Sequence, residues 1–392
     1  MAEAGGLKKR VVIINKFGAR HSSITGKSAI ELADFLSGKG VEVHIVSIRT
    51  QYKGLSSDIK ELHNYSVTEL KSFYNGDKKY LRLIFSLIDG FRLITKSMCL
   101  KKHEVKIVMT DPPLLNALAI FLSPFYKSKL MFWTMDLYPD AFLSTGLVSS
   151  KNIIYQILSR FVYRNPPDYL LCLGHQQLSY LTLKYMNINI RHTILPCGLI
   201  KPMDNFQDIP NWKVANNDKI LFCYAGNIGE AHSAEFLISL IDILNPVKYK
   251  IILSLYGSKT VEVLNNIKNK EAVIKVDFLV PEHLKYIDIN VASLLPKWNN
   301  VCVPSKVVSA ICAGTPVLYN ATENSEGYQM FSEAIWLISK FDDFSSELKI
   351  FLEKLTHEEI LRKKIITKKY AENLLEMEKE ALNQILNFVN QI

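Results

Sequence analysis

The sequence of 392 residues contains no apolar run long enough to cross a membrane and no C-x-x-C pair. The best candidate for a span, residues 114–125, falls short of the roughly 18 residues that a transmembrane helix needs and closes on Lys127 and Lys129. The six cysteines lie singly in apolar or strand-like surroundings, so we interpret them as reduced packing residues of a cytoplasmic protein. Residues 1–10 lack the apolar region of a signal peptide, and we therefore expect neither secretion nor a membrane span.

Acidic residues are scarce in the first half of the chain. Residues 1–200 contain 26 Lys and Arg against 14 Asp and Glu, whereas residues 201–392 contain 21 against 24. A basic half suits the binding of a phosphorylated substrate, nucleic acid or an anionic lipid surface. The alternative is that these lysines are simply solvated and reflect a proteome that is basic in general. The basic residues form no recognisable nucleic-acid-binding module, which argues against nucleic acid.

What the chain does contain is an alternation of short apolar strands with helices, typical of parallel α/β sheets. The first set of predicted strands covers residues 11–15, 41–48, 105–110, 129–136, 168–174 and 192–196, with a polar loop at 16–25 and a helix at 28–40. After a linker at 201–217, a second set covers residues 220–225, 250–256, 273–279, 290–295, 316–319 and 334–338. Length and pattern predict two doubly wound α/β halves, with ligands at the carboxyl ends of the strands.

One strand-to-helix turn of the second half has the residues of a phosphate site. The spacing predicts a helix that begins at Pro304, Ser305 and Lys306 and ends at Gly314, directly before a strand. A helix N-terminus that carries a free hydroxyl and a lysine is suited to a phosphate or a diphosphate.

A second turn of this kind comes earlier in the same half. Gly226, Asn227 and Gly229 lie between an apolar strand and a predicted helix at 234–243. Two glycines let backbone N–H groups approach an anionic oxygen, although many α/β turns need a glycine for the turn alone. Two helix N-termini facing one crevice would hold a diphosphate.

These motifs resemble, in order and spacing, the family 4 retaining glycosyltransferases. The resemblance is closest to the branch that builds bacterial O-antigen, capsule and colanic-acid-like polysaccharides. It covers most of the chain and is specific in the second half. The residues that carry it are Gly226–Gly229, Asp277–Leu279 with Glu282–Leu284, Pro304–Lys306 through Gly314–Val317, and Trp133–Asp140.

The resemblance implies a GT-B fold, in which two Rossmann-like domains face each other across a cleft. Residues 1–205 would form the acceptor-binding domain and residues 206–370 the nucleotide-sugar-binding domain. Residues 371–392 would form a helix that packs back toward the first domain. The implied reaction moves a sugar from a nucleotide diphosphate sugar, with retention and without a catalytic metal, and no Asp-x-Asp motif is present.

The resemblance also implies roles for particular residues. Lys306 would stabilise charge on the leaving diphosphate, and Asp136 would orient a sugar hydroxyl or assist as a base, with a structural capping role as its alternative. Acceptor-side contacts would come from the loop with Gly18, Arg20 and His21. The donor would be bound by Gly226, Asn227, Gly229, Gly257, Leu279, Pro304, Ser305 and Ser309.

The chain departs from the family pattern mildly at Asn227, where relatives usually carry a basic residue, and more seriously at two other positions. Relatives carry two glutamates where this sequence has Val301 and Ser309, and the second glutamate normally holds the donor ribose. A Ser309 hydroxyl would supply about 1 kcal/mol in place of a charge-assisted hydrogen bond of about 1.5–3 kcal/mol. Two alternatives therefore stay open: a catalytically impaired nucleotide-sugar-binding subunit and a GT-B-fold sugar-nucleotide 2-epimerase.

Two further segments of the first half need interpretation. Thr25–Ser28 imitates the end of a P-loop, but His21 stands where that motif needs a glycine. Residues 80–102 form a basic amphipathic segment, which could lie in a bilayer interface or pack on the core as an ordinary helix. Together with the basic first half, the segment leads us to expect a lipid-linked saccharide acceptor at the cytoplasmic face of the inner membrane.

Overall fold

A computed structural model of the chain describes residues 8–18, 23–49, 64–74, 78–201 and 208–392. The chain divides into two compact units. The N-terminal unit comprises residues 1–197 together with 378–392, and the C-terminal unit comprises residues 198–377. None of the helices in these described ranges is long and apolar enough to span a membrane.

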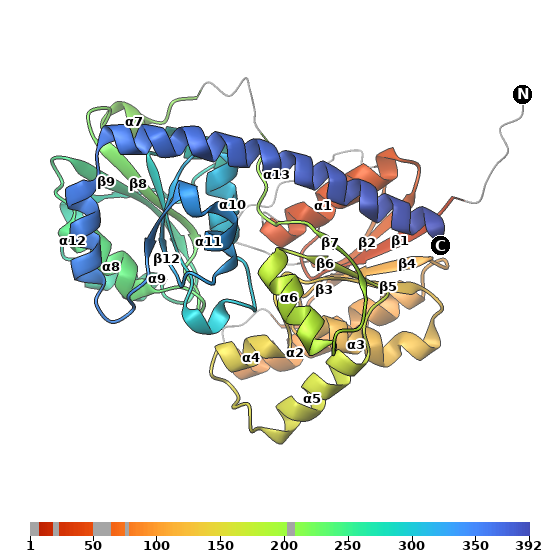
Figure 1. Ribbon diagram of the computed structural model, residues 1–392. Helices are drawn as coiled ribbons and strands as arrows, with labels where there is room; N and C mark the ends of the chain where they lie inside the picture. Colours follow the sequence, from red (N-terminus) through yellow and green to blue (C-terminus); the bar gives the residue numbers. More distant parts are fainter. Residues whose placement is uncertain (1–7, 19–22, 50–63, 75–77, 202–207) are drawn as a thin grey trace, which may run out of the picture. The chain divides into compact units, whose positions relative to one another are not determined.

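The N-terminal unit is built on a parallel sheet of seven strands. They are β1 (Arg10–Ile14), β2 (Glu42–Arg49), β3 (Ser66–Lys71), β4 (Val105–Val108), β5 (Lys129–Trp133), β6 (Tyr169–Cys172) and β7 (Arg191–Ile194). Their order across the sheet is β3-β2-β1-β4-β5-β6-β7 (Figure 1). The inner strand β1 pairs in parallel with β2 and β4, and its residues 11–14 are fully buried. Such an apolar strand is what a sheet covered on both faces requires.

Helices connect the strands of this sheet. They are α1 (Ile24–Gly38), α2 (Lys79–Met98), α3 (Leu115–Leu122), α4 (Asp140–Ser144), α5 (Ile153–Arg164) and α6 (His175–Lys184), and a 3₁₀ turn at Ser123–Phe125 follows α3. The helix α3 packs between α2 and α5 (Figure 1). The close approach of α2 to α3 depends on Gly90, where an added Cβ would lie 2.9 Å from a methyl carbon of Leu118.

The C-terminal unit contains a second parallel sheet, of six strands. They are β8 (Ile220–Asn227), β9 (Tyr249–Tyr256), β10 (Val273–Lys275), β11 (Ile289–Ser293), β12 (Val317–Asn320) and β13 (Ile335–Ile338), ordered β10-β9-β8-β11-β12-β13 (Figure 1). The helices of this unit are α7 (Asn211–Val214), α8 (Ala234–Ile243), α9 (Thr260–Asn266), α10 (Ser305–Cys312), α11 (Glu326–Phe331) and α12 (Phe344–Lys354). Shorter 3₁₀ turns lie at Lys270–Ala272, Pro281–Tyr286, Pro296–Trp298 and Ser332–Ala334.

The last helix, α13 (His357–Gln391), contributes to both units. In the C-terminal unit, the buried Lys363 ammonium donates to the backbone carbonyls of Glu333 and Ile335, at 2.8 and 3.0 Å. From residue 378 onward the helix belongs to the N-terminal unit, where the Phe388 ring lies 4.6 Å from the Tyr169 ring. The helix is therefore anchored at each end by contacts within the unit to which that end belongs.

The two predicted parallel sheets are confirmed, with corrections at individual elements. The first helix begins at Ile24 and not at Ser28, because the Ser23 hydroxyl caps it by accepting a hydrogen bond from the Gly26 N–H. The imitation P-loop at 25–28 is thus the first turns of that helix. Strand β3 was not predicted, the predicted strand at 273–279 ends at residue 275, and the predicted linker contains the short helix α7.

Candidate functional site

Lys306 lies at the start of α10, where its ammonium meets the turn that follows β8. The Lys306 Nζ donates to the Asn227 carbonyl at 2.7 Å and to the His232 ring Nε2 at 3.0 Å. It also lies 5.4 Å from the centre of the Tyr224 ring. The side chain thus bridges two strand-to-helix turns at the carboxyl ends of β8 and β11, the edge of a parallel sheet at which ligands bind.

His232 fixes the direction of this lysine. The His232 Nδ1 lies 2.5 Å from the Ser293 carbonyl, which can only accept, so Nδ1 carries the proton and Nε2 accepts from Lys306. Burial, together with the charge of Lys306, lowers the pKa of His232 to about 3. The imidazole therefore stays neutral at physiological pH and can serve as an acceptor for the ammonium. Lys259 supports the same loop by donating to the His232 carbonyl at 2.6 Å.

Lys306 has a pKa close to neutral pH. Burial lowers the pKa of its ammonium to about 7. The cause is desolvation of the partly buried side chain, and no carboxylate among the described residues forms an ion pair with it. An anion bound against the Nζ would restore the charged form. The site is therefore suited to a phosphate oxygen and gains charge when one binds.

Two glycines let the backbone pass close to Lys306 and to its hydrogen-bond partner Asn227. Gly226 has φ +120°, and a Cβ there would lie 3.1 Å from the Lys306 Cε. Gly257, which follows β9, has φ +113°, and a Cβ there would lie 2.0 Å from the Asn227 Oδ1. Only glycine adopts such backbone conformations without strain. An added Cβ at Gly229 would lie 3.3 Å from the Asn227 Nδ2.

No side chain of the described residues caps the N-terminus of α10. Pro304 occupies the N-cap position and offers no hydrogen bond from its side chain, and the first carbonyl-bonded amide is that of Val307. Within the part of the chain that the structure describes, the Ser305 hydroxyl has no hydrogen-bond partner. A helix start with free N–H groups beside an ammonium is an anion site.

Ser309 and Leu279 have other environments than Lys306. The Ser309 hydroxyl donates to the Gly198 carbonyl at 2.6 Å. Gly198 has φ +87°, and a Cβ there would lie 3.0 Å from that same hydroxyl. The Leu279 side chain is buried in an apolar cluster with Leu221 and Ile252. Both side chains thus have partners within the C-terminal unit, and their donor-binding roles stay predictions.

Asp136 lies in the N-terminal unit, beyond the carboxyl end of β5. Its backbone N–H donates to the Thr110 hydroxyl at 3.0 Å, which ties the loop after β5 to the end of β4. Burial, with a smaller effect from the Asp111 charge, raises the pKa of Asp136 to about 7. Burial also raises the pKa of Asp111, whose backbone carbonyl accepts from Lys16 at 2.7 Å. A carboxyl with a pKa near neutrality can hold or release a proton during a reaction.

Of the three predicted acceptor-side residues, only Gly18 belongs to the described part of the chain. An added Cβ at Gly18 would lie 2.1 Å from the Ser47 hydroxyl at the end of β2, so the loop after β1 needs a glycine to pass this strand. Arg20 and His21 lie outside the described residues.

Two groups that organise these sites were not predicted from the sequence. His232 stands three residues after Gly229, and a histidine that close to a glycine-rich turn was the available signal. Thr110 ends the predicted strand 105–110, at the edge where ligands bind. Their partners, Lys306 and Asp136, are 74 and 26 residues away in the chain, so neither contact is visible in local sequence.

No family model matches the chain, and no curated protein sequence matches it either. Solved structures do match over nearly its whole length. Sucrose-phosphate synthase from Thermosynechococcus elongatus is 12% identical, with 98% of this chain and 99% of that chain covered at a TM-score of 0.72. WaaG, a glycosyltransferase involved in lipopolysaccharide biosynthesis, is 12% identical, with 96% and 99% covered at 0.67. Anabaena HepE, solved in complex with UDP and glucose, is 11% identical, with 98% and 100% covered at 0.66.

These neighbours confirm the predicted fold class. Two parallel-sheet, Rossmann-like units with structural neighbours among GT-B glycosyltransferases identify the architecture of this chain as GT-B. Sequence identities of 9–12% establish a shared fold and leave the reaction to be argued from the residues.

Proposed function

We propose that the protein is a retaining glycosyltransferase that takes its sugar from a nucleotide diphosphate sugar. The observation that supports this most is the arrangement around Lys306. An ammonium, the uncapped start of α10 and two left-handed glycines converge at one sheet edge, where a diphosphate would find a cation and backbone N–H donors. Pro304, Ser305, Gly226, Asn227, Gly229 and Gly257 would form the walls of this donor site.

In the proposed reaction, the bond between the anomeric carbon and the diphosphate oxygen breaks while the acceptor hydroxyl oxygen bonds to that carbon. The acceptor proton passes to the leaving diphosphate, and charge develops on the diphosphate as the bond breaks. Lys306 and the N–H groups of α10 stabilise that charge, so they act more strongly in the transition state than in the bound donor. Neither an enzymatic nucleophile nor a metal is needed, and a rate unchanged by EDTA would support the latter point.

Asp136 would act on the acceptor side of the same reaction. A carboxyl with a pKa of about 7 can accept a hydrogen bond from a sugar hydroxyl as the anion or hold a proton as the acid. Because the diphosphate takes the proton in this scheme, we assign Asp136 the orientation of a sugar hydroxyl. Its replacement should therefore lower turnover more than donor affinity.

The acceptor that we propose is a lipid-linked saccharide in cell-surface polysaccharide synthesis, reached at the cytoplasmic face of the inner membrane. Two observations support this choice. The first half of the chain carries an excess of 12 basic residues, which suits an anionic lipid surface or a diphosphate-linked lipid. One structural neighbour, WaaG, is described as acting in lipopolysaccharide biosynthesis.

One observation favours a second function, that of a nucleotide-sugar-binding subunit without efficient turnover. Val301 is buried, and the Ser309 hydroxyl is already bonded to the Gly198 carbonyl. The positions at which relatives carry glutamates thus supply no carboxylate to the donor ribose. The binding of a nucleotide would survive this change through the diphosphate contacts, whereas orientation of the sugar would suffer.

A single experiment separates the candidates. The full chain is incubated with UDP-, GDP- and dTDP-hexoses, with and without a polyprenyl-diphosphate-linked monosaccharide in detergent, and products are followed by NMR. Transfer with the donor's anomeric configuration kept, abolished in Lys306→Ala, supports the proposal. Donor binding without transfer in any combination indicates the binding subunit, inversion contradicts retention, and a C2 epimer formed without acceptor indicates the epimerase.

A further inference from the structure

The helices α2, α3 and α5 neighbour one another in the N-terminal unit (Figure 1). Large apolar side chains of these helices and of the 3₁₀ turn at Ser123–Phe125 are left uncovered. Each of these side chains is at least 37% exposed, although the helices themselves are packed against one another and the sheet. Exposed apolar groups gathered on neighbouring elements mark an interaction surface. We call this set the outer face; its residues are Leu81, Ile84, Ile88, Phe91, Phe121, Phe125, Ile153, Ile154 and Ile157.

The helical periodicity shows that these side chains lie on the solvent side of their helices. Ile84, Ile88 and Phe91 form one stripe of α2 at the spacing i, i+4, i+7, whereas Gly90 and Leu93 are buried on the opposite side. On α5, Tyr155 and Val162 are buried, while Ile153 and Ile157 are 70% and 64% exposed. Both helices already have an apolar side for the core, so folding alone does not account for a second one.

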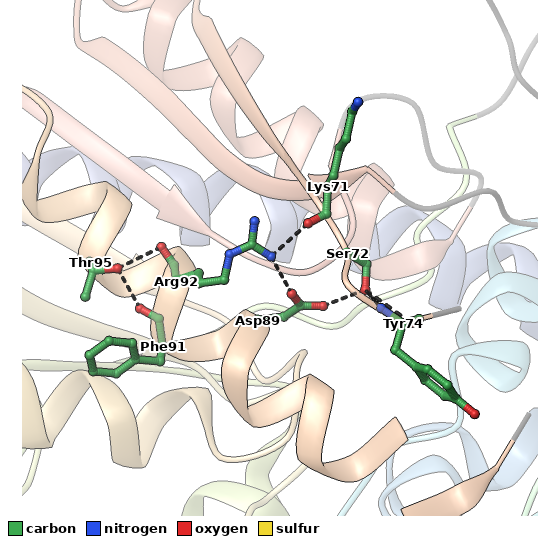
Figure 2. Close-up of polar contacts among 7 residues, drawn as sticks. All are labelled: Lys71, Ser72, Tyr74, Asp89, Phe91, Arg92 and Thr95. Atoms are coloured by element: carbon green, nitrogen blue, oxygen red, sulfur yellow. Dashed lines mark hydrogen bonds and ion pairs between the residues drawn. The ribbon is translucent and has the colours of Figure 1, made fainter. Parts of the chain in front are cut away.

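The charge around the outer face is nearly all positive. Residues 81–102, 115–129 and 147–164 contain ten Lys and Arg and a single acidic residue, Asp89. Figure 2 shows how that carboxylate is neutralised: Arg92 donates to it at 2.8 Å and the Ser72 hydroxyl at 2.7 Å. Asp89 is 3% exposed, and Arg92 also bonds the Lys71 carbonyl and lies 4.0 Å from the Phe73 ring. The surface therefore presents basic and apolar groups with no accessible acid from these segments.

A basic pocket adjoins the isoleucines of α5. Its volume is about 550 Å³, and its basic lining residues are Arg160, Arg164 and Lys184. Lys184 pairs with the buried Asp140 at 3.3 Å. Among the described side chains, neither arginine forms an ion pair. The two guanidinium groups stand one and two turns beyond Ile157 on the exposed side of the helix. Apolar groups and phosphate-binding basic groups thus lie on one face of α5, as in helices that lie in a bilayer interface.

We propose that the outer face docks on an anionic phospholipid bilayer, with headgroup phosphates in the pocket of Arg160 and Arg164. This rests on the proposed function, which requires a lipid-borne acceptor. A second copy of the same face is excluded as the occupant by charge, because two such basic surfaces repel each other. An acidic protein partner would complement the positive charge, but its surface would also have to match the shape of the whole outer face. A bilayer accepts isolated apolar side chains at any spacing.

The topology places the start of the outer-face helices toward the acceptor side of the unit. In a parallel sheet each crossover helix runs back against its strands, so α2 and α5 begin near the carboxyl ends of the strands. Ile153 belongs to the first turn of α5 and Ile84 to the second turn of α2, whereas Arg160 and Arg164 lie in the last turns of α5. Asp136 follows β5 at the same edge, so the start of α5 lies toward the acceptor side of this unit.

The test is co-sedimentation of the full chain with vesicles of phosphatidylcholine alone or mixed with phosphatidylglycerol. The wild-type chain should bind the anionic vesicles at least tenfold more strongly than the neutral ones. Because each basic residue at an anionic surface contributes about fivefold, R160E/R164E should lower binding by about 25-fold or more. The apolar variant I153Q/I154Q/I157Q should lower it at least tenfold. The matched controls are K368E/K369E and V261Q/L361Q/I365Q, which change exposed residues of the C-terminal unit and should bind as the wild type does.

The outcomes separate this proposal from the proposed function. Equal binding to neutral and anionic vesicles, wild-type binding by both α5 variants, or no vesicle binding at all overturns the docking surface. Binding of a nucleotide diphosphate sugar is measured for the same proteins without vesicles, where all of the variants should match the wild type. A chain that binds the donor but no vesicles overturns only the docking surface, whereas a chain that binds vesicles but no donor overturns the proposed function.

Discussion

The pH dependence of donor binding tests the role of Lys306 in depth. Burial lowers the pKa of this ammonium to about 7 in the free site, and a bound diphosphate favours the charged form, which raises that pKa in the complex. Donor affinity should therefore be full below pH 7 and fall as pH rises above it. One pKa unit corresponds to 1.36 kcal/mol, so between about pH 6 and pH 8.5 the loss should approach 2 kcal/mol, or about 30-fold in Kd.

The assay is isothermal titration with a nucleotide diphosphate sugar, whose diphosphate diester does not titrate in this range. His232 is the titratable group in direct contact, and its pKa of about 3 keeps it neutral throughout. Lys306→Arg keeps its charge at every pH of the assay and should give a flat profile, whereas Lys306→Ala should bind weakly and without pH dependence. Lys268→Ala, at an exposed position of the same unit, is the control. A flat wild-type profile, or a Lys306→Arg profile that falls as the wild type does, would refute the reasoning.

Three further substitutions test other parts of the account. Gly257→Ala should lower the free energy of unfolding by about 1–3 kcal/mol through backbone strain and the collision with Asn227, and should weaken donor binding. The control is Gly38→Ala, in open space at a helix end, which should not destabilise the fold. Chemical denaturation measures both changes. Asp136→Asn should lower the turnover number while the donor Kd stays within about twofold, which steady-state kinetics with titration calorimetry would show. His232→Phe removes the acceptor that directs the Lys306 ammonium and should weaken donor binding about tenfold in calorimetry, the size of one charge-assisted hydrogen bond; unchanged affinity would mean that Asn227 alone positions the lysine.

The strands and the long helices could be predicted because the sheets are buried on both faces and the strands read as apolar runs. Strand β3 escaped prediction because it lies at the edge of its sheet, with the mixed sequence SVTELK and no fully buried residue. The start of α1 was predicted at the wrong residue because several serines and threonines near Ser23 are equally suitable N-caps in the sequence. Local signals thus located the elements, and tertiary context decided their ends.

The candidate site was predictable in part for a similar reason. The local sequence predicts an anion site, because a helix begins there with Pro304, Ser305 and Lys306. That His232 accepts from Lys306, or that Ser309 bonds Gly198, depends on contacts between residues 74 and 111 positions apart, which no local pattern encodes. Likewise, the amphipathic segment at 80–102 was visible in the sequence, but the exposed isoleucines of α5 became a shared face with it only once α3 was placed between the two helices.

The central claim, that the edge around Lys306 holds a nucleotide diphosphate, is tested most directly by a thermal-shift panel of the full chain with UDP, GDP, dTDP and CMP. At a hundredfold excess over Kd, a bound nucleotide should stabilise the fold by about 2.7 kcal/mol. We expect such a shift with at least one of the nucleoside diphosphates, its loss in Lys306→Ala, and little response to the monophosphate. No shift with any nucleotide, or an equal shift in Lys306→Ala, would contradict the account.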